Sequence, residues 1–135
     1  EEFTQGGFKE VLDDPFIDDA AVVKKVLLCS GKMYFDLSDK QAKDDRKDVA
    51  IVRLEQLYPL PVKQLEAIAQ KYKGATFFWV QEEPLNMGAA AFLQMHLKQI
   101  NYGVISRNPS ASTATGYAKV HTREQQQIID TAFNI

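Results

Sequence analysis

Four polar clusters in this sequence hold the side chains best suited to chemistry, and each follows a short apolar run. They are Ser30-Gly31-Lys32, Glu55-Gln56, Gln81-Glu82-Glu83 and Ser106-Arg107-Asn108. Their hydroxyl, amine, amide, carboxylate and guanidinium groups are those that proteins use to bind anions or to move protons. What they can do depends on the elements that carry them and on whether those elements bring them together.

The Ser30-Gly31-Lys32 cluster is expected to open a helix, which allows two interpretations. The backbone N–H groups of a first helical turn, together with the Lys32 amine, could hold an anion. Alternatively, Ser30 only caps the helix and Gly31 only permits the turn before it. The general preference for serine at helix starts favours the second interpretation.

Glu82 and Glu83 are adjacent, so on an extended backbone their side chains point to opposite sides. They therefore make a poor acid/base pair, and the sequence supplies no other matched partner for such chemistry. Pro84 is expected only to end the strand behind them. We expect one of the two carboxylates to pair with a cation across the domain or across a subunit boundary.

The single cysteine and the two histidines do not form a metal-binding pattern. Cys29 lies in an apolar run and is expected to be a small buried hydrophobe rather than a nucleophile. As the only cysteine it cannot form an intramolecular disulfide, which indicates a reducing compartment. His96 is expected on a helix face, and His121 near the start of the last helix.

Catalytic and phosphate-binding motifs are missing. The sequence contains no GxGxxG, no GxxxxGK[ST] and no G-x-S-x-G. An alternating strand and helix pattern without these signatures favours an accessory domain over an independent enzyme.

Short apolar runs predict four buried strands, at residues 26–29, 49–54, 76–80 and 103–106. Helical spacing predicts a helix that begins after Gly31 and others near 62–72, 89–100 and 125–133. Residues 107–121 are expected to form an ordered loop. This alternation predicts an α/β fold, a three-layer Rossmann-like domain with a mostly parallel sheet and helices on both faces. Carboxyl ends of parallel strands share one edge, where such folds bind ligands.

The domain is assigned to residues 22–135, after an N-terminal arm or linker of residues 1–21 rich in Gly, Pro and Asp. With 135 residues the chain is long enough for one domain with its own core.

Sixteen basic and 18 acidic residues leave a net charge of −2, which excludes nucleic-acid binding by bulk charge. No apolar run approaches the roughly 20 residues of a membrane span. The first residue is Glu1 rather than Met, so we expect a piece of a longer protein.

The polar clusters lie within four motifs that resemble a known family. These motifs are LCSGKMYFDL at 28–37, DVAIVRLEQLYP at 48–59, WVQEEPLNMGA at 79–89 and RNPSASTATGY at 107–117, followed by Val120-His121 and EQQQ at 124–127. In colinear order over essentially the whole chain, they resemble the C-terminal domain of the thiamine-diphosphate-dependent decarboxylase, the first component of 2-oxoglutarate dehydrogenase. The resemblance implies a transketolase C-terminal-domain-like fold.

The resemblance also implies what the parent enzyme does. The parent belongs to a multienzyme complex of the tricarboxylic acid cycle, decarboxylates 2-oxoglutarate and passes the succinyl group to a lipoyl group of the succinyltransferase component. Thiamine diphosphate and Mg²⁺ bind an earlier domain of the parent, whose GDG motif is absent here. This fragment is therefore expected to bind neither cofactor nor metal and to have no turnover alone. Its implied partners are the remainder of the polypeptide, a homodimer partner and the succinyltransferase, in the bacterial cytoplasm or the mitochondrial matrix.

Within that family the domain is expected to brace the homodimer, and its strand-end edge offers a contact for another domain or for an effector anion. The edge comprises Ser30, Gly31, Lys32, Gln81, Glu82, Glu83 and Arg107. Three alternatives stay open: a 2-oxoadipate dehydrogenase domain with the same pattern, a stand-alone anion- or nucleotide-binding module, and a pure subunit-assembly domain.

Overall fold

A central five-stranded sheet carries the fold in the computed structural model, which describes residues 10–107 and 118–134. The elements follow in the order β1 (Val11–Leu12), the 3₁₀ turn η1 (Ala20–Val22), β2 (Lys25–Cys29), α1 (Lys32–Lys43), β3 (Val49–Leu54), α2 (Val62–Lys71), β4 (Thr76–Pro84), α3 (Ala89–His96), β5 (Tyr102–Arg107) and α4 (Ala118–Ala132). The strand order is β1-β3-β2-β4-β5. Strands β2 to β5 pair in parallel, and β1 runs antiparallel to β3.

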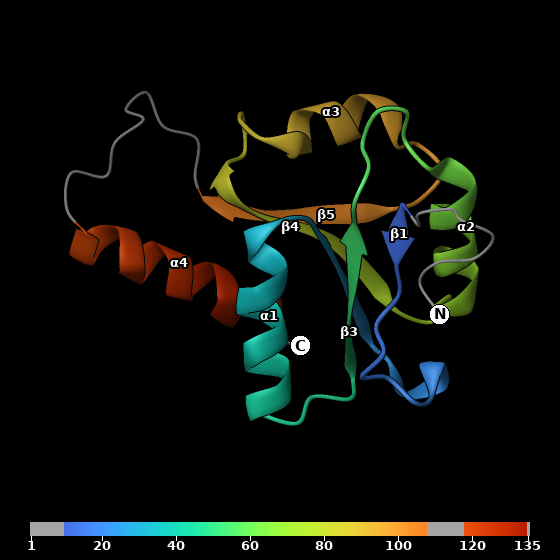
Figure 1. The fold of residues 1–135 in the computed structure, drawn as a ribbon, viewed down its shortest axis with the longest axis horizontal. Helices are drawn as coiled ribbons and strands as arrows, with labels where there is room; N and C mark the ends of the chain where they lie inside the picture. The colour runs from blue at the N-terminus through green and yellow to red at the C-terminus, as the bar shows by residue number, and fades with distance from the viewer. Residues whose placement is uncertain (1–9, 108–117, 135) are drawn as a thin grey trace.

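The two faces of the sheet are covered by different pairs of helices (Figure 1). One face packs Val26 and Trp79 against Leu65 of α2 and Leu93 of α3. Successive strand residues point to opposite faces, so Leu27 belongs to the other cluster, with α1 and α4. Burial on both faces explains why the strands read as continuous apolar runs. The predicted three-layer α/β fold and all four predicted strands are confirmed.

Two helix boundaries differ from the prediction. Helix α3 ends at His96 rather than near Ile100, because the backbone becomes extended at Leu97. Leu97 and Ile100 still pack on the core from an irregular segment, which is why their spacing mimicked a helix. Helix α4 begins at Ala118, so residues 118–121 are helical where a loop was expected. The rest of that expected loop, residues 108–117, lies outside the described residues.

The described part of the N-terminal arm contributes an edge strand, which the sequence analysis did not predict. Val11 pairs with Leu54 and Leu12 with Arg53 of β3. Immediately beyond this short ladder, the buried Asp14 carboxylate accepts the backbone N–H of Ile51 at 2.8 Å. Asp14 thus continues the pairing of β3 after β1 has ended.

Asp13 and Asp14 connect the arm to both helical layers. Asp14 also accepts the Gln41 amide of α1 at 2.7 Å, and Asp13 accepts the Tyr72 hydroxyl beside the end of α2 at 2.7 Å. The arm therefore crosses the edge of the sheet and holds one helix on each face. The boundary at residue 21 stays a prediction. No helix in the described ranges is both long and apolar enough to cross a membrane.

Candidate functional site

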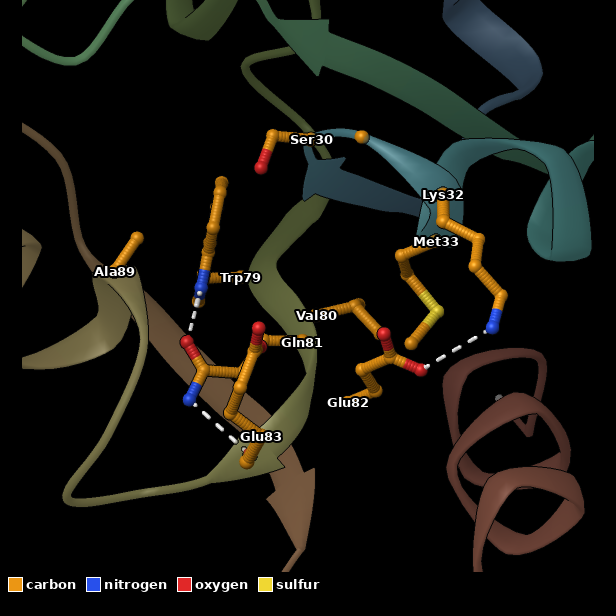
Figure 2. A pocket seen from close by; sticks show the side chains of 10 residues that line it. Ser30, Lys32, Met33, Trp79, Val80, Gln81, Glu82, Glu83 and Ala89 are labelled. Carbon is orange, nitrogen blue, oxygen red and sulfur yellow. Dashed lines mark hydrogen bonds and ion pairs between the residues drawn. The ribbon is translucent and has the colours of Figure 1, made fainter. Parts of the chain in front are cut away.

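The carboxyl edge of β2 and β4 holds a pocket of about 180 Å³ (Figure 2). The two strands are parallel neighbours with Leu28 opposite Trp79, so the residues after them emerge side by side. Six of the seven edge residues chosen from the sequence line this pocket: Ser30, Gly31, Lys32, Gln81, Glu82 and Glu83. Arg107 is not among its lining residues. The topology brings the clusters together, and their role stays a prediction.

Gly31 makes the turn from β2 into α1. Its φ of +59° lies in the left-handed region, and an added Cβ there would meet nothing within 4 Å. Glycine is therefore favoured by the backbone conformation and not by crowding. Gly31 itself is the N-cap, without a side-chain hydrogen bond, so the expectation that Ser30 caps the helix is wrong. The start of α1 thus faces the pocket without a side-chain cap.

Lys32 and Glu82 face each other across the mouth of the pocket (Figure 2). Their Nζ and Oε1 atoms are 3.9 Å apart, and the Lys32 side chain is 71% exposed. A contact this long in solvent contributes at most about 1 kcal/mol. Of the two adjacent carboxylates Glu82 and Glu83, Glu82 is thus the one that faces a cation across the domain, as the sequence led us to expect. The amine stays accessible from solvent beside the first turn of α1.

Gln81 is a buried hydrogen-bonding hub. Its side-chain oxygen accepts the Trp79 indole N–H and the Ala90 backbone N–H, both at 2.9 Å. Its side-chain nitrogen donates to the backbone carbonyls of Glu83, Pro84 and Met87, at 3.2, 2.8 and 2.7 Å. These contacts occupy both the amide nitrogen and the amide oxygen of the Gln81 side chain. The role of Gln81 is therefore to position the turn after β4 and the start of α3.

Glu83 lies on the other side of β4 from Glu82, next to the glycine that begins α3. Its Oε1 would be 3.0 Å from a Cβ added at Gly88, whose φ is +68°. The opposite orientations of Glu82 and Glu83 agree with the alternation expected of an extended backbone. Glu83 thus belongs to the α3 side of the pocket and Glu82 to the α1 side.

Arg107 ends β5 and faces α4 instead of the pocket. Its Nε lies 3.6 Å from a carboxylate oxygen of Glu124, and its side chain is largely buried. Its backbone carbonyl accepts the N–H of Leu85 at 3.1 Å, which ties the turn after β4 to β5. The sequence correctly assigned it to a strand end, but β5 is the sheet edge, one strand beyond the pocket.

Sequence reasoning missed the packing of Arg53 at the neighbouring strand end. Its guanidinium stacks on the rings of Tyr34 and Phe35, with centroid distances of 4.7 and 5.5 Å. Its Nε is 2.6 Å from the Glu55 carboxylate, so Glu55, one of the polar residues singled out from the sequence, is paired with a residue two positions before it. The signal available in the sequence was one arginine inside an otherwise apolar run.

Cys29 and His96 occupy the kinds of position that the sequence indicated. Cys29 is fully buried, and this burial raises the pKa of its thiol to about 12, so it is not a nucleophile near neutral pH. His96 lies at the end of α3, where its ring stacks on Phe92 at 4.3 Å. Within the described ranges, no three His, Cys, Asp or Glu side chains come together as metal ligands.

Comparison with known proteins decides the family. The model of the family described as 2-oxoglutarate dehydrogenase C-terminal matches residues 1–133. The chain belongs to the 2-oxoglutarate dehydrogenase C-terminal family. This confirms the resemblance drawn from the four motifs.

Curated relatives of this family member carry names that refer to the same 2-oxo acid. The chain is 44% identical to the 2-oxoglutarate dehydrogenase E1/E2 component of Corynebacterium glutamicum, over 98% of this chain and 12% of the relative. It is 40% identical to oxoglutarate dehydrogenase of Buchnera aphidicola, over 99% of this chain and 15% of that one. A multifunctional 2-oxoglutarate metabolism enzyme of Mycolicibacterium vanbaalenii is 42% identical, over 98% and 12%. The 2-oxoglutarate dehydrogenase C-terminal domain thus spans a small part of these relatives.

A solved structure supports the fold. The chain superposes on a split-gene transketolase, an inactive β4 tetramer, with a TM-score of 0.59 and 14% identity. The match covers 98% of this chain and 46% of the transketolase chain. The predicted likeness to a transketolase domain is confirmed at the level of fold.

Proposed function

We propose that this chain is the C-terminal domain of the thiamine-diphosphate-dependent decarboxylase component of a 2-oxoglutarate dehydrogenase. The observation that carries the proposal is 40–44% identity, over nearly the whole chain, to relatives named for 2-oxoglutarate. The parent enzyme is an oxidoreductase that decarboxylates 2-oxoglutarate and succinylates the lipoyl group of the succinyltransferase component. The domain itself has a structural, dimer-bracing role. Its compartment is the cytoplasm of a bacterium, or the mitochondrial matrix of a eukaryote.

Mg²⁺, which accompanies thiamine diphosphate in the parent, does not fit the described residues of this domain. Mg²⁺ needs converging oxygen ligands, and the described ranges bring no such cluster of carboxylates together. The pocket itself holds an amine 3.9 Å from one carboxylate, which is a poor site for a divalent cation. We therefore assign thiamine diphosphate and Mg²⁺ to another part of the parent.

An activity assay tests the proposed parent reaction. The longer protein that contains this chain, supplied with thiamine diphosphate and Mg²⁺, should turn over 2-oxoglutarate faster than 2-oxoadipate. Faster turnover of 2-oxoadipate would replace the proposal with its alternative. The 135-residue chain alone should turn over neither substrate, and turnover by it would overturn the accessory role.

The pocket at the carboxyl edge is proposed as a contact for an effector anion or for another domain. The uncapped start of α1 and the exposed Lys32 amine favour an anion, because both present positive charge to the same hollow. Calorimetry with inorganic phosphate, ADP and an acyl-coenzyme A should give binding that Lys32→Gln weakens. Lys63→Gln, which changes a lysine of α2 outside the pocket, is the control. Absence of heat with all three probes would leave only the domain-contact role.

The bracing role makes a separate prediction about charge. Reversal of Glu83, on the α3 side of the pocket, should weaken the dimer of the longer protein more than reversal of Glu82, which faces Lys32 of the same chain. Sedimentation velocity measures the mass. An unchanged mass for both variants would argue against a bracing role for this edge.

A further inference from the structure

The chain enters this domain at the carboxyl edge of the sheet. β1 lies beside β3 in Figure 1 and runs antiparallel to it, so the first residue of β1, Val11, is opposite the last residue of β3, Leu54. Just before β1, the Glu10 carbonyl accepts the backbone N–H of Glu55 at 2.7 Å. The polypeptide that precedes Glu10 therefore joins the domain at the same edge that carries the pocket.

The arm fixes this entry point on the sheet. The Glu10 carboxylate accepts the side-chain amide of Gln64 in α2 at 2.6 Å, and the hydrogen bonds of Asp13 and Asp14 then hold both helical layers. The nine residues before Glu10 reach at most about 30 Å even when fully extended. Any part of the parent that precedes Glu1 is therefore attached close to the carboxyl edge.

An exposed aromatic and charged surface lies beside this entry point. The Phe35 ring of α1 is 57% exposed, and Lys32 lies one turn earlier on the same side of the helix. Next to Phe35 lies Arg53 of β3, which is in register with Leu12 of the arm. We call Lys32, Phe35, Arg53 and Glu55 the entry surface. It follows the ends of β3 and β2, and β2 is two strands from β1, or about 10 Å.

The entry surface has the composition of an interface centre, where aromatic residues and arginine are enriched. The Phe35 ring is in edge contact with the Tyr34 ring at 5.2 Å, and the Arg53 guanidinium lies over it at 5.5 Å. Glu55 holds Arg53 from the other end of this group. The exposed ring is thus already held in position, which lowers the entropic cost of packing a partner on it.

We propose that the part of the parent polypeptide that precedes this domain covers the entry surface, packs on Phe35 and presents a carboxylate to Lys32. The inference rests on the proposed function, because it needs the parent, and it names the domain contact left open there. The chain covers only 12–15% of its relatives, and its family is described as C-terminal, so most of the parent precedes it.

The short connection favours this partner over a second copy. A partner attached through a short connection has an effective concentration of about millimolar, whereas a second copy must be bound from solution. The charge of Lys32 sets the chemistry of the partner. Among the described residues its one ion pair is the 3.9 Å contact with Glu82, so covering the amine requires a further carboxylate.

Acetylation of lysines in the longer protein by acetic anhydride, read out by mass spectrometry, tests this inference. Lys73 is the reference, since it is exposed between α2 and the amino end of β4, at the opposite edge of the sheet. Lys32 should be acetylated at least about tenfold more slowly than Lys73, because a contact open at most about 10% of the time exposes the amine for only that fraction. The ratio should not change on dilution, since the contact lies within one polypeptide.

Variants of the longer protein locate the cause of the protection. Phe35→Ala removes the apolar part of the contact and should bring the acetylation rate of Lys32 toward that of Lys73. Val22→Ala is the matched control, because Val22 is an exposed hydrophobe of η1, before the amino end of β2. Glu82→Gln should leave Lys32 protected, because the pair inside the domain is long and weak. Circular dichroism confirms that each variant is folded.

The outcomes separate this inference from the proposed function. Acetylation of Lys32 as fast as that of Lys73 would overturn the inference, and so would protection that is lost on dilution or in Glu82→Gln. Equal rates in Phe35→Ala and Val22→Ala would overturn it as well. If Lys32 is protected while the longer protein fails to turn over 2-oxoglutarate, the contact stands and the proposed function fails. If turnover is present and Lys32 is acetylated freely, only the contact fails.

Discussion

At the scale of single residues, the pocket depends on Gln81 more than on any charged side chain. The sequence placed Gln81 among polar groups that could meet a ligand, whereas its partners are Trp79, Ala90 and the carbonyls of the turn after β4. Those partners could not be foreseen, because most belong to a turn whose path only the folded backbone defines. The position of the edge residues was predictable, since it follows from parallel strand order.

Gln81→Leu should destabilise the chain by about 2–4 kcal/mol, because it leaves the Trp79 indole N–H and several backbone groups without partners in a buried site. Urea unfolding measures the change. Gln56→Leu is the control, since that amide makes one exposed hydrogen bond, to the Pro59 carbonyl. A loss no larger than that of the control would show that water replaces Gln81 readily.

Gly88→Ala should destabilise the chain by about 1–2 kcal/mol, because alanine is strained at a φ of +68° and its Cβ would press on Glu83. Gly74→Ala should be neutral or slightly stabilising, since a Cβ there meets nothing within 4 Å. Thermal unfolding of the two variants gives the comparison. Equal melting temperatures would contradict the requirement for glycine at the start of α3.

At the scale of elements, long buried strands were predictable and short or marginal ones were not. The apolar runs of β2 and β3 identified them because both faces of each strand are covered. β1 has only two residues, Val11 and Leu12, and is held by an edge ladder and by the Asp14 carboxylate. Such an element has no periodicity, so the Gly, Pro and Asp around it suggested an irregular arm.

The arm should make stability depend on pH through Asp13. Burial alone would raise the pKa of Asp13, but hydrogen bonds from Lys71 and Tyr72 outweigh it and hold the pKa below its usual value of 3.8. A carboxyl with a lowered pKa stabilises the fold above its unfolded pKa of about 3.9, and this contribution is lost as the pH falls through the folded value.

Asp13→Asn should therefore lower the urea midpoint at pH 6 and 7, and the difference from the unmodified chain should shrink as the pH falls below about 4. Asp18→Asn is the control, because the Asp18 side chain is 88% exposed and its carboxylate makes a long contact of 3.6 Å with the Lys47 amine. A difference that stays constant down to the acid range would contradict the role given to the Asp13 carboxylate.

At the scale of the whole molecule, the sheet joins two hydrophobic clusters into one unit. β4 contributes Trp79 to the cluster under α2 and α3, and Val80 to the cluster under α1 and α4. Strands β2 and β3 do the same through alternate residues. Loss of either cluster would expose one face of the same strands, so the two should not unfold separately.

The single tryptophan, Trp79, tests this expectation because it is almost fully buried on β4, beside the central strand β2. Its fluorescence and the circular dichroism of the helices should follow one coincident transition in urea. A helical transition at lower urea than the fluorescence change would indicate that the α1 and α4 layer unfolds first. Leu93→Ala and Leu37→Ala, one in each cluster, should each shift both signals together.

The short arm strand also governs how this chain behaves toward other sheets. An uncovered edge strand presents unpaired N–H and C=O groups that can template fibrous aggregation. β1 and the Asp14 carboxylate occupy that edge of β3, at Leu54, Arg53 and Ile51. A shortened version that starts after Asp14 would retain most of both hydrophobic clusters. It would nevertheless expose the unpaired backbone groups along this edge of β3. Such trimming would therefore damage solubility on storage in addition to lowering the melting temperature.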